Sequence, residues 1–138
     1  MTILVVRDRQ APLRHEIRIG RHTLSTDLGS EQGGEGSGPT PHDLYDAALG
    51  ACKALTVLLY AKRKKFLLED VQVSVERDAG EEHAGIYRLN TSLTLTGDLT
   101  AAQREELVRV AQKCPIQRLM REVTTEITTV LSVSHEGV

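Results

Sequence analysis

Residues 38–65 decide the fold, and they read GPTPHDLYDAALGACKALTVLLYAKRKK. Thr40 is a favourable N-cap residue, and Pro41 after it suits the first position of a helix. Asp43, three residues after Thr40, completes a variant of the capping box. The stretch therefore predicts one helix from Pro41 to about Lys65, which at about 1.5 Å per residue is about 37 Å long.

The polar residues inside this helix are few and evenly spaced. Asp46, Lys53 and Tyr60 recur every seven residues and form one narrow stripe. A helix that is apolar nearly all round is buried on most sides, and one small domain has difficulty wrapping a helix of this length. The simplest cover is a second subunit, which small helix residues would allow to come close. The apolar and small residues are Leu44, Ala47, Ala48, Leu49, Gly50, Ala51, Leu55, Val57, Leu58 and Leu59.

Charge and aromatic content argue against nucleic acid as a partner. The 138 residues carry a net charge of −2, with no Trp, one Phe and three Tyr. A nucleic-acid binder needs a basic field and rings on which bases stack. The helix does end in the basic run Lys62-Arg63-Lys64-Lys65. Such a run complements the helix dipole, which favours a solvated helix end over an anion site.

Alternating apolar and polar residues predict strands on both sides of the central helix. The period of two appears three times before residue 27 and twice after residue 70. Between them, residues 27–38 hold five glycines, which predicts a mobile loop. The expected strands lie around Ile3 to Val5, Leu13 to Ile19, His22 to Thr26, Val71 to Glu76 and Tyr87 to Leu95, the last two forming a long hairpin.

Two more helices and a strand are expected after the hairpin. Thr100 and Gln103 form a second capping box, and Pro115 interrupts the helix that it opens and starts another. The order of elements is typical of an α+β protein and not of a wound parallel sheet. The length fits one domain, residues 1–138. The elements expected here are a helix to about Gln112, a short helix from Ile116 to Arg121 and a final strand from Val123 to Val133.

No targeting or membrane segment is recognisable in the sequence. The apolar run at the N-terminus, Ile3 to Val6, is too short for a signal peptide. The stretch from Leu44 to Ala61 is interrupted by charged residues, so no membrane span is predicted. We therefore expect a cytoplasmic protein. In a reducing cytosol its two cysteines are expected to be free or redox-active.

Several common chemistries have no motif in this chain. The glycine stretch lacks a following Gly-Lys-Ser or Gly-Lys-Thr, and there is no Gly-x-Ser-x-Gly elbow. A zinc site needs about four clustered ligands, whereas the five histidines are scattered and no Cys-x-x-Cys pair exists. The sequence therefore predicts no metal and no bound cofactor.

The two cysteines, Cys52 and Cys114, are the remaining candidates. Cys52 lies in the middle of the long helix, where a cysteine can also serve as a small core residue. Cys114 precedes Pro115 at an expected helix N-terminus, where backbone N–H groups and the dipole stabilise a thiolate. From position alone, Cys114 is the better candidate for a lowered pKa, although it can also be a half-buried cap. They stand 62 residues apart, so only the fold can bring them together.

Two motifs resemble those of the OsmC/Ohr family. Residues 38–44, GPTPHDL, followed by residues 47–52, AALGAC, look like the first cysteine motif. Residues 113–116, KCPI, look like the second, and the order of elements also agrees. The resemblance covers about residues 13–133. It implies an OsmC-like fold, in which two long central helices are wrapped by antiparallel sheets of an intertwined homodimer.

The resemblance also implies an activity. In characterised members the first cysteine attacks the terminal oxygen of an organic hydroperoxide and becomes a sulfenic acid. The second cysteine then forms a disulfide with it, and an external dithiol reduces that disulfide. By this resemblance Cys52 is the peroxidatic cysteine and Cys114 the resolving one, which reverses the preference from position alone. The active sites are expected at the dimer interface.

One position departs from the well-studied branch of the family, which has a Glu ten residues before the first cysteine and an Arg near the first strands. Here His42 stands ten residues before Cys52, and Asp43 stands nine before it. Asp43 is therefore a candidate for orienting a cation at the site, or simply a capping residue. No motif fixes Arg18 or Arg21 as the supporting arginine.

Two functions follow from this sequence. The first is a thiol-dependent peroxidase that reduces organic hydroperoxides by a disulfide cycle between Cys52 and Cys114. The alternative is a non-catalytic member of the fold that binds an apolar small molecule at the dimer interface. Retention of both cysteines favours the first, and the missing Glu favours the second.

Overall fold

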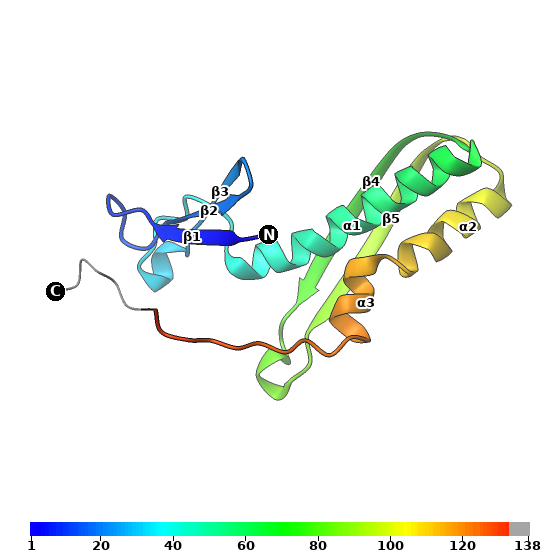
Figure 1. The fold of residues 1–138 in the computed structure, drawn as a ribbon. Coiled ribbons are helices and arrows are strands. Elements are labelled where there is room, and N and C mark those ends of the chain that lie inside the picture. The colour runs from blue at the N-terminus through cyan, green and yellow to red at the C-terminus, as the bar shows by residue number, and fades with distance from the viewer. Residues whose placement is uncertain (133–138) are drawn as a thin grey trace.

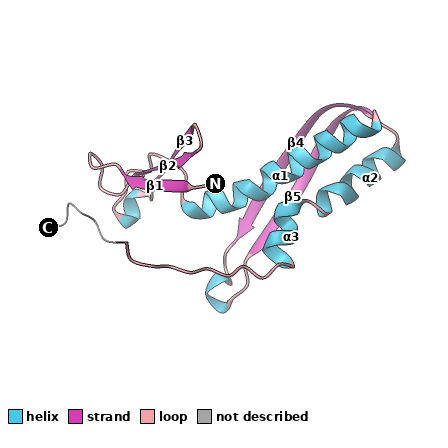
Figure 2. Ribbon diagram, in the orientation of Figure 1, coloured by secondary structure: helices cyan, strands magenta, loops and turns pink. Residues whose placement is uncertain are grey.

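The computed structural model describes residues 1–132, and it has two antiparallel sheets and three α-helices (Figures 1 and 2). The fold is α+β, as the sequence predicts. Two short 3-10 helices, η1 and η2, lie in the connections. In chain order the elements are β1 (Ile3–Arg7), β2 (His15–Ile19), β3 (His22–Thr26), η1 (Ser30–Gln32), α1 (Pro41–Lys64), β4 (Leu67–Asp78), η2 (Glu82–Ala84), β5 (Arg88–Asp98), α2 (Ala101–Gln112) and α3 (Pro115–Arg121).

The first three strands form a small sheet that stands apart from the rest (Figure 1). Its order is β1-β2-β3, with Val5 opposite Ile17 and Ile17 opposite Leu24. No α-helix within residues 1–132 packs over this sheet, and large apolar side chains of β1 remain more than half exposed. The sheet joins α1 through the Pro39 carbonyl, which accepts hydrogen bonds from the Asp27 N–H and the Thr26 hydroxyl.

Helix α1 begins and ends close to the predicted residues. The Thr40 hydroxyl accepts from the Asp43 N–H at 3.1 Å, and the Asp43 carboxylate accepts from the Thr40 N–H at 3.0 Å. This reciprocal pair is the predicted capping box, and it satisfies two backbone donors that a helix start leaves free. The helix ends at Lys64, because Lys65 takes a left-handed conformation.

The hairpin β4–β5 and helix α2 cover one side of α1 (Figure 1). The backbones come close at Gly50, where an added Cβ would lie 3.0 Å from the Val75 side chain. Farther along, Val57 and Ala61 of α1 form a buried core with Leu107 and Ala111 of α2. The half-buried residues around that core are Tyr60, Phe66, Leu68, Val71, Leu93, Leu95 and Leu99.

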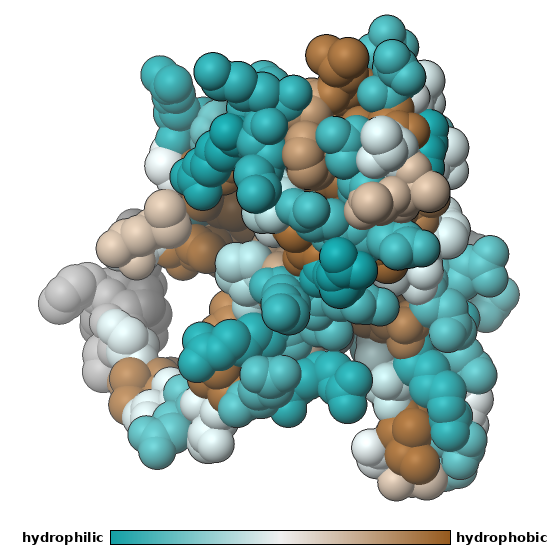
Figure 3. Space-filling view, turned by 90° about the vertical axis from the view of Figure 1, so that its right-hand side faces the viewer, coloured by the Kyte–Doolittle hydropathy of each residue, from teal (hydrophilic) through white to brown (hydrophobic). Residues whose placement is uncertain are grey.

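Within this chain, α1 is buried along one side only, and that side includes the polar stripe. Asp46 is 7% exposed and Lys53 is 3% exposed, together with Leu49 and the core residues. On the apolar side, Leu55 is 68% exposed and Leu59 is 50% exposed. The stripe therefore faces the chain's own interior. Figure 3 shows apolar residues at the surface in several separate places on one side of the molecule. That a second subunit covers the apolar side stays a prediction.

The predicted final strand is wrong for the part that the structure describes. Residues 124–132 have no strand partner and follow α3 as an extended, exposed segment (Figure 2). The Thr and Ile alternation favours an extended backbone, but a strand also needs a neighbour to hydrogen-bond, and none lies beside it here. Val133 lies outside the described residues.

The loop before α1 is more organised than its glycines predict. The buried Asp27 carboxylate accepts hydrogen bonds from the backbone N–H groups of Leu28, Glu35 and Ser37 and from the Ser37 hydroxyl. These bonds, led by those from Ser37, lower the pKa of Asp27 to about 2. One buried carboxylate thus closes the loop on itself.

Helix α1 is also the one helix, among residues 1–132, that is long and apolar enough to cross a membrane. One such helix is weak support for a membrane protein, because the core helix of a soluble protein passes the same test. The predicted absence of a membrane span therefore stays a prediction.

Candidate functional site

The structure brings the two cysteines together. Cys52 lies half-buried in the middle of α1, and Cys114 is fully buried as the N-cap of α3. The backbone N–H of Ile116, in the first turn of α3, donates to the Cys52 Sγ at 3.5 Å. The Cys52 thiol is near enough to Cys114 to be among the groups that raise the pKa of Cys114. Both thiols are free. The break between α2 and α3 therefore seats Cys114 against the middle of α1.

Burial controls the ionisation of Cys114. Loss of solvent raises the pKa of the Cys114 thiol, because a thiolate is poorly stabilised without water. The Gln117 N–H and the nearby Lys53 ammonium lower that pKa, but less than burial raises it. The expectation from position alone, that Cys114 has a lowered pKa, is therefore wrong. Sequence spacing showed the helix start but not the depth at which it lies.

Lys53, next to Cys52 in the sequence, is a buried cation. Its Nζ donates to the Ala111 carbonyl at 2.8 Å and to the Gln117 side-chain oxygen at 2.5 Å. Ala111 belongs to α2 and Gln117 to α3, so one side chain of α1 ties both helices on either side of Cys114. Sequence reasoning placed Lys53 in a polar stripe and assigned it no role.

Asp43 lies in a different cluster. Besides capping α1, its carboxylate accepts from Arg77 of β4 at 2.7 Å. The Thr40 N–H first, and then Arg77, hold the pKa of Asp43 below its usual range. Asp43 is the predicted capping residue, and that it orients a cation at the cysteine site stays a prediction. However, it stands nine residues, or about 13 Å of helix, before Cys52, and no hydrogen bond among the described residues joins it to either cysteine.

The same arginine reaches the buried start of the polar stripe. Arg77 Nε donates to Asp46 at 2.6 Å, and the Tyr87 hydroxyl donates to the other Asp46 oxygen at 2.7 Å. Hydrogen bonds to Asp43 and Asp46 raise the pKa of Arg77. Burial, and then the bond to Asp46, raise the pKa of Tyr87. These groups hold the hairpin against α1. Arg18, which no motif fixed as a supporting arginine, pairs with Glu16 on β2.

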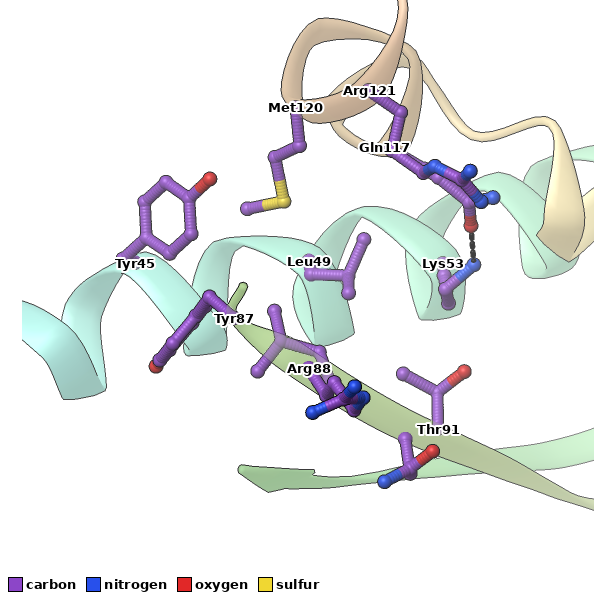
Figure 4. Close-up of a pocket in the computed structure, with 11 residues that line it drawn as sticks. Tyr45, Leu49, Lys53, Tyr87, Arg88, Thr91, Gln117, Met120 and Arg121 are labelled. Carbon is purple, nitrogen blue, oxygen red and sulfur yellow. Dashed lines mark hydrogen bonds between the residues drawn. The ribbon is translucent and has the colours of Figure 1, made fainter. Parts of the chain in front are cut away.

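Two cavities lie beside the cysteine pair without being lined by it. The larger, of about 560 Å³, lies between α1, β5 and α3, and Figure 4 shows its lining. Lys53 and Gln117 reach it from the cysteine side, Arg88 and Arg121 add positive charge, and Tyr45 is among its apolar residues. A second cavity, of about 400 Å³, is more apolar. Its lining residues are Tyr45, Ala48, Ile116, Leu119, Met120, Val123 and Thr125.

Comparison with known proteins gives the family of this chain. The family model described as OsmC-like protein matches residues 34–129, which include both cysteines. The chain therefore belongs to the OsmC-like proteins. The resemblance seen in the two cysteine motifs is thereby confirmed. No curated protein matches the chain in the corresponding comparison.

Solved structures agree on the fold. A Psychrobacter arcticus protein described as an osmotic stress induced and detoxification response protein has a TM-score of 0.73 at 18% identity, covering 88% of this chain and 89% of its own. The organic hydroperoxide resistance protein OsmC of Legionella pneumophila has a TM-score of 0.60 at 27% identity, covering 88% and 90%. OhrB, the organic hydroperoxide resistance protein of Bacillus subtilis, has 0.56 at 22% identity, covering 88% and 92%. The OsmC-like fold is thus confirmed.

Proposed function

We propose that this protein is a thiol-dependent peroxidase that reduces organic hydroperoxides with Cys52 and Cys114. The observation that carries the proposal is the meeting of these two thiols across 62 residues of sequence. Paired thiols that can reach each other suit a cycle between a dithiol and a disulfide. Similarity to proteins named for organic hydroperoxide resistance supports the class of substrate.

The division of roles follows from exposure. Cys52 is half-buried and borders the exposed apolar side of α1, whereas Cys114 has no exposed surface. The Cys52 thiolate attacks the terminal oxygen of the hydroperoxide. An S–O bond forms, the O–O bond breaks, and the alkoxide leaves and takes up a proton to become the alcohol. Cys52 is then a sulfenic acid next to its resolving partner.

Resolution and reduction complete the cycle. Cys114 attacks the Cys52 sulfenic sulfur, which forms the disulfide and releases hydroxide, protonated to water. An external dithiol then reduces this disulfide by two thiol–disulfide exchanges and is itself oxidised. The apolar cavity of about 400 Å³, lined by Ala48 and Ile116, suits the carbon chain or ring of an organic hydroperoxide.

A homodimer is part of the proposal. The apolar side of α1, the uncovered sheet β1–β3 and the unpaired segment 124–132 together expose many large apolar residues in one chain. Surfaces of this kind mark interaction sites. A second copy that lays its sheet over α1 would bury them and would close the region around Cys52.

The alternative function is binding of a small molecule without catalysis. It is favoured by one observation, the absence of both cysteines from the linings of the 560 Å³ and 400 Å³ cavities. A pure binding protein would hold an apolar small molecule at the dimer interface and leave the thiols unused.

One experiment separates the two functions. The reduced protein is mixed with one equivalent of cumene hydroperoxide per chain, and free thiols are then counted. We expect the wild type to lose both thiols and Cys52→Ser to keep its remaining one. Cys114→Ser should consume one equivalent and accumulate sulfenic acid or more oxidised products, because nothing resolves it. Two thiols persisting in the wild type would overturn the peroxidase proposal and leave the binding function.

A further inference from the structure

Lys53 is buried without a carboxylate partner among the residues that the structure describes. Only 3% of the residue is exposed, and it takes part in none of the ion pairs formed within residues 1–132. Its two acceptors, the Ala111 carbonyl and the Gln117 amide oxygen, are neutral. A buried charge without a counterion is costly. A group near the Lys53 ammonium that can become negatively charged would serve as its partner.

The anchoring bonds of Lys53 point to that partner. Ala111 stands three residues before Cys114, and Gln117 stands three residues after it. Figure 4 shows the Lys53 side chain rising from α1 to Gln117 on α3. The Lys53 ammonium is therefore hydrogen-bonded to both ends of the segment 111–117, which carries Cys114. The residue before Lys53 on α1 is Cys52 itself.

We propose that Lys53 is a positioning residue, whose ammonium holds the Cys114 segment against α1 and serves as counterion to the Cys114 thiolate when it attacks the Cys52 sulfenic acid. The resolving part rests on the function proposed above. In that step the S–S bond forms as the S–O bond breaks, and hydroxide leaves and is protonated by solvent. Removing the ammonium would leave a fully buried thiol with fewer groups to stabilise its anion.

The other charged groups near this place have partners or lie farther along the cavity. On α1, Asp46 accepts from Arg77 of β4 and Tyr87 of β5. On β5, Arg88 pairs with Glu81. Arg121 of α3 lines the same cavity, whereas Lys53 is the cation whose charge lowers the pKa of Cys114. Lys53 is thus the cation to vary.

The first test measures Cys114 by itself and needs no peroxide. In a Cys52→Ser background, Lys53→Met removes the charge and keeps the apolar stem, whereas Lys53→Arg keeps the charge. The Cys114 thiolate is titrated by its ultraviolet absorbance and by its rate of reaction with a small methanethiosulfonate. We expect about tenfold less thiolate at a given pH below its pKa in Lys53→Met, equivalent to about one pKa unit, and a smaller change in Lys53→Arg.

Two controls keep this test sharp. Lys62→Met removes an exposed lysine of the same helix, two and a half turns farther on, and should leave the titration unchanged. If Lys53→Met does not fold, Lys53→Gln keeps hydrogen-bond donors at the site without the charge. An unchanged titration in the folded, uncharged variant overturns the proposal.

The second test keeps both cysteines and follows the resolving step. After one equivalent of cumene hydroperoxide, the Cys52 sulfenic acid is trapped with dimedone at successive times. We expect it to persist about ten times longer in Lys53→Met than in the wild type, with the rate of its formation little changed. Sulfenic acid that forms and disappears at wild-type rates would overturn the role of Lys53 and leave the peroxidase intact.

The two failures are distinguishable. If no sulfenic acid forms in any variant, the peroxidase proposal fails, while the Cys114 titration still decides whether Lys53 is its counterion. A titration that moves in Lys53→Met and is preserved in Lys53→Arg then supports the electrostatic assignment and removes only the resolving step.

Discussion

The two sides of α1 are made from the same helix but are satisfied in different ways. One side carries Asp46, Lys53 and the core residues Val57 and Ala61, and the chain's own hairpin and later helices bury it. The other side carries Leu55 and Leu59, which are 68% and 50% exposed. The polar stripe is thus inside the chain and the apolar side outside it.

This difference teaches that polarity alone does not say which way a helix faces. Asp46 and Lys53 of the stripe are buried because specific partners meet them: Arg77 and Tyr87 at Asp46, and two oxygens at Lys53. Buried polar groups are tolerated when they are hydrogen-bonded in this way. The apolar side needs no particular geometry, only cover, so it suits contact with another chain.

The largest effect is expected where the apolar side is given charge. Leu55→Asp combined with Leu59→Asp should convert a dimer to a monomer, because two carboxylates would have to be buried in the interface. Sedimentation equilibrium measures the mass. Lys62→Asp, on the exposed end of the same helix, serves as the control and should leave the mass unchanged. A doubly substituted chain that keeps the mass of two copies would show that α1 does not form the interface.

A matched pair of leucines compares the two kinds of burial directly. Leu107→Ala removes a fully buried side chain from the core between α1 and α2, and should lower the free energy of unfolding by about 2–5 kcal/mol. Leu55→Ala should weaken association and leave the unfolding of the separated chain within about 0.5 kcal/mol of wild type. Urea unfolding at several protein concentrations separates the two. If Leu107→Ala and Leu55→Ala lower the free energy of unfolding equally at low protein concentration, the two sides of α1 are not buried in different ways.

The polar stripe is tested by removing its buried carboxylate. Asp46→Ala leaves the Tyr87 hydroxyl without its acceptor and takes one of two acceptors from Arg77 Nε, which keeps its bond to the Tyr87 oxygen. We expect it to lower the free energy of unfolding by about 2 kcal/mol. The figure is at the low side for a charged bond because Arg77 is a third exposed and water can replace part of it. Asp46→Asn, which keeps one acceptor, should lose less. Urea unfolding measures the free energy of unfolding of both variants. If neither variant is less stable than the wild type, the buried Asp46 carboxylate does not stabilise the fold.

Much of the fold could be predicted because its signals are local. Capping boxes at Thr40 and Thr100 and the alternation in β4 and β5 place these elements within a few residues. The segment 124–132 could not, since a strand depends on a neighbour that periodicity does not reveal. Which side of α1 faces the chain's interior could not be predicted either, because Arg77, the partner of Asp46, is 31 residues away in the sequence.

The site was predictable only through motifs. Spacing indicated Cys52 and Cys114 as candidates, but their meeting depends on the path of the whole hairpin and α2. Lys53 carried a weak signal, a charged residue in an apolar helix next to a cysteine, and only its buried contacts give that signal meaning. Asp43 was noticed for its distance from Cys52, whereas the structure ties it to Arg77.

The smallest effect is expected at Asp43, where the stripe side of α1 reaches solvent. Its folded pKa is lowered, chiefly by the Thr40 N–H and then by Arg77, so its charged form adds stability. That contribution is present above the unfolded pKa of about 3.9 and is lost as the pH falls through the folded value. Asp43→Asn keeps an acceptor for the cap but loses the ion pair. Because both partners are partly exposed, the loss at pH 7 should be about 0.5 kcal/mol.

The pH dependence makes this small effect measurable. The difference in unfolding free energy between wild type and Asp43→Asn should be constant at neutral pH and shrink as the pH falls below about 4, because both side chains are then uncharged. Asp98→Asn, at the exposed end of β5, provides the matched control. A difference that stays the same down to about pH 2 would mean that the carboxylate acts through the cap alone. The charged contact between this side of α1 and the hairpin would then end at Asp46.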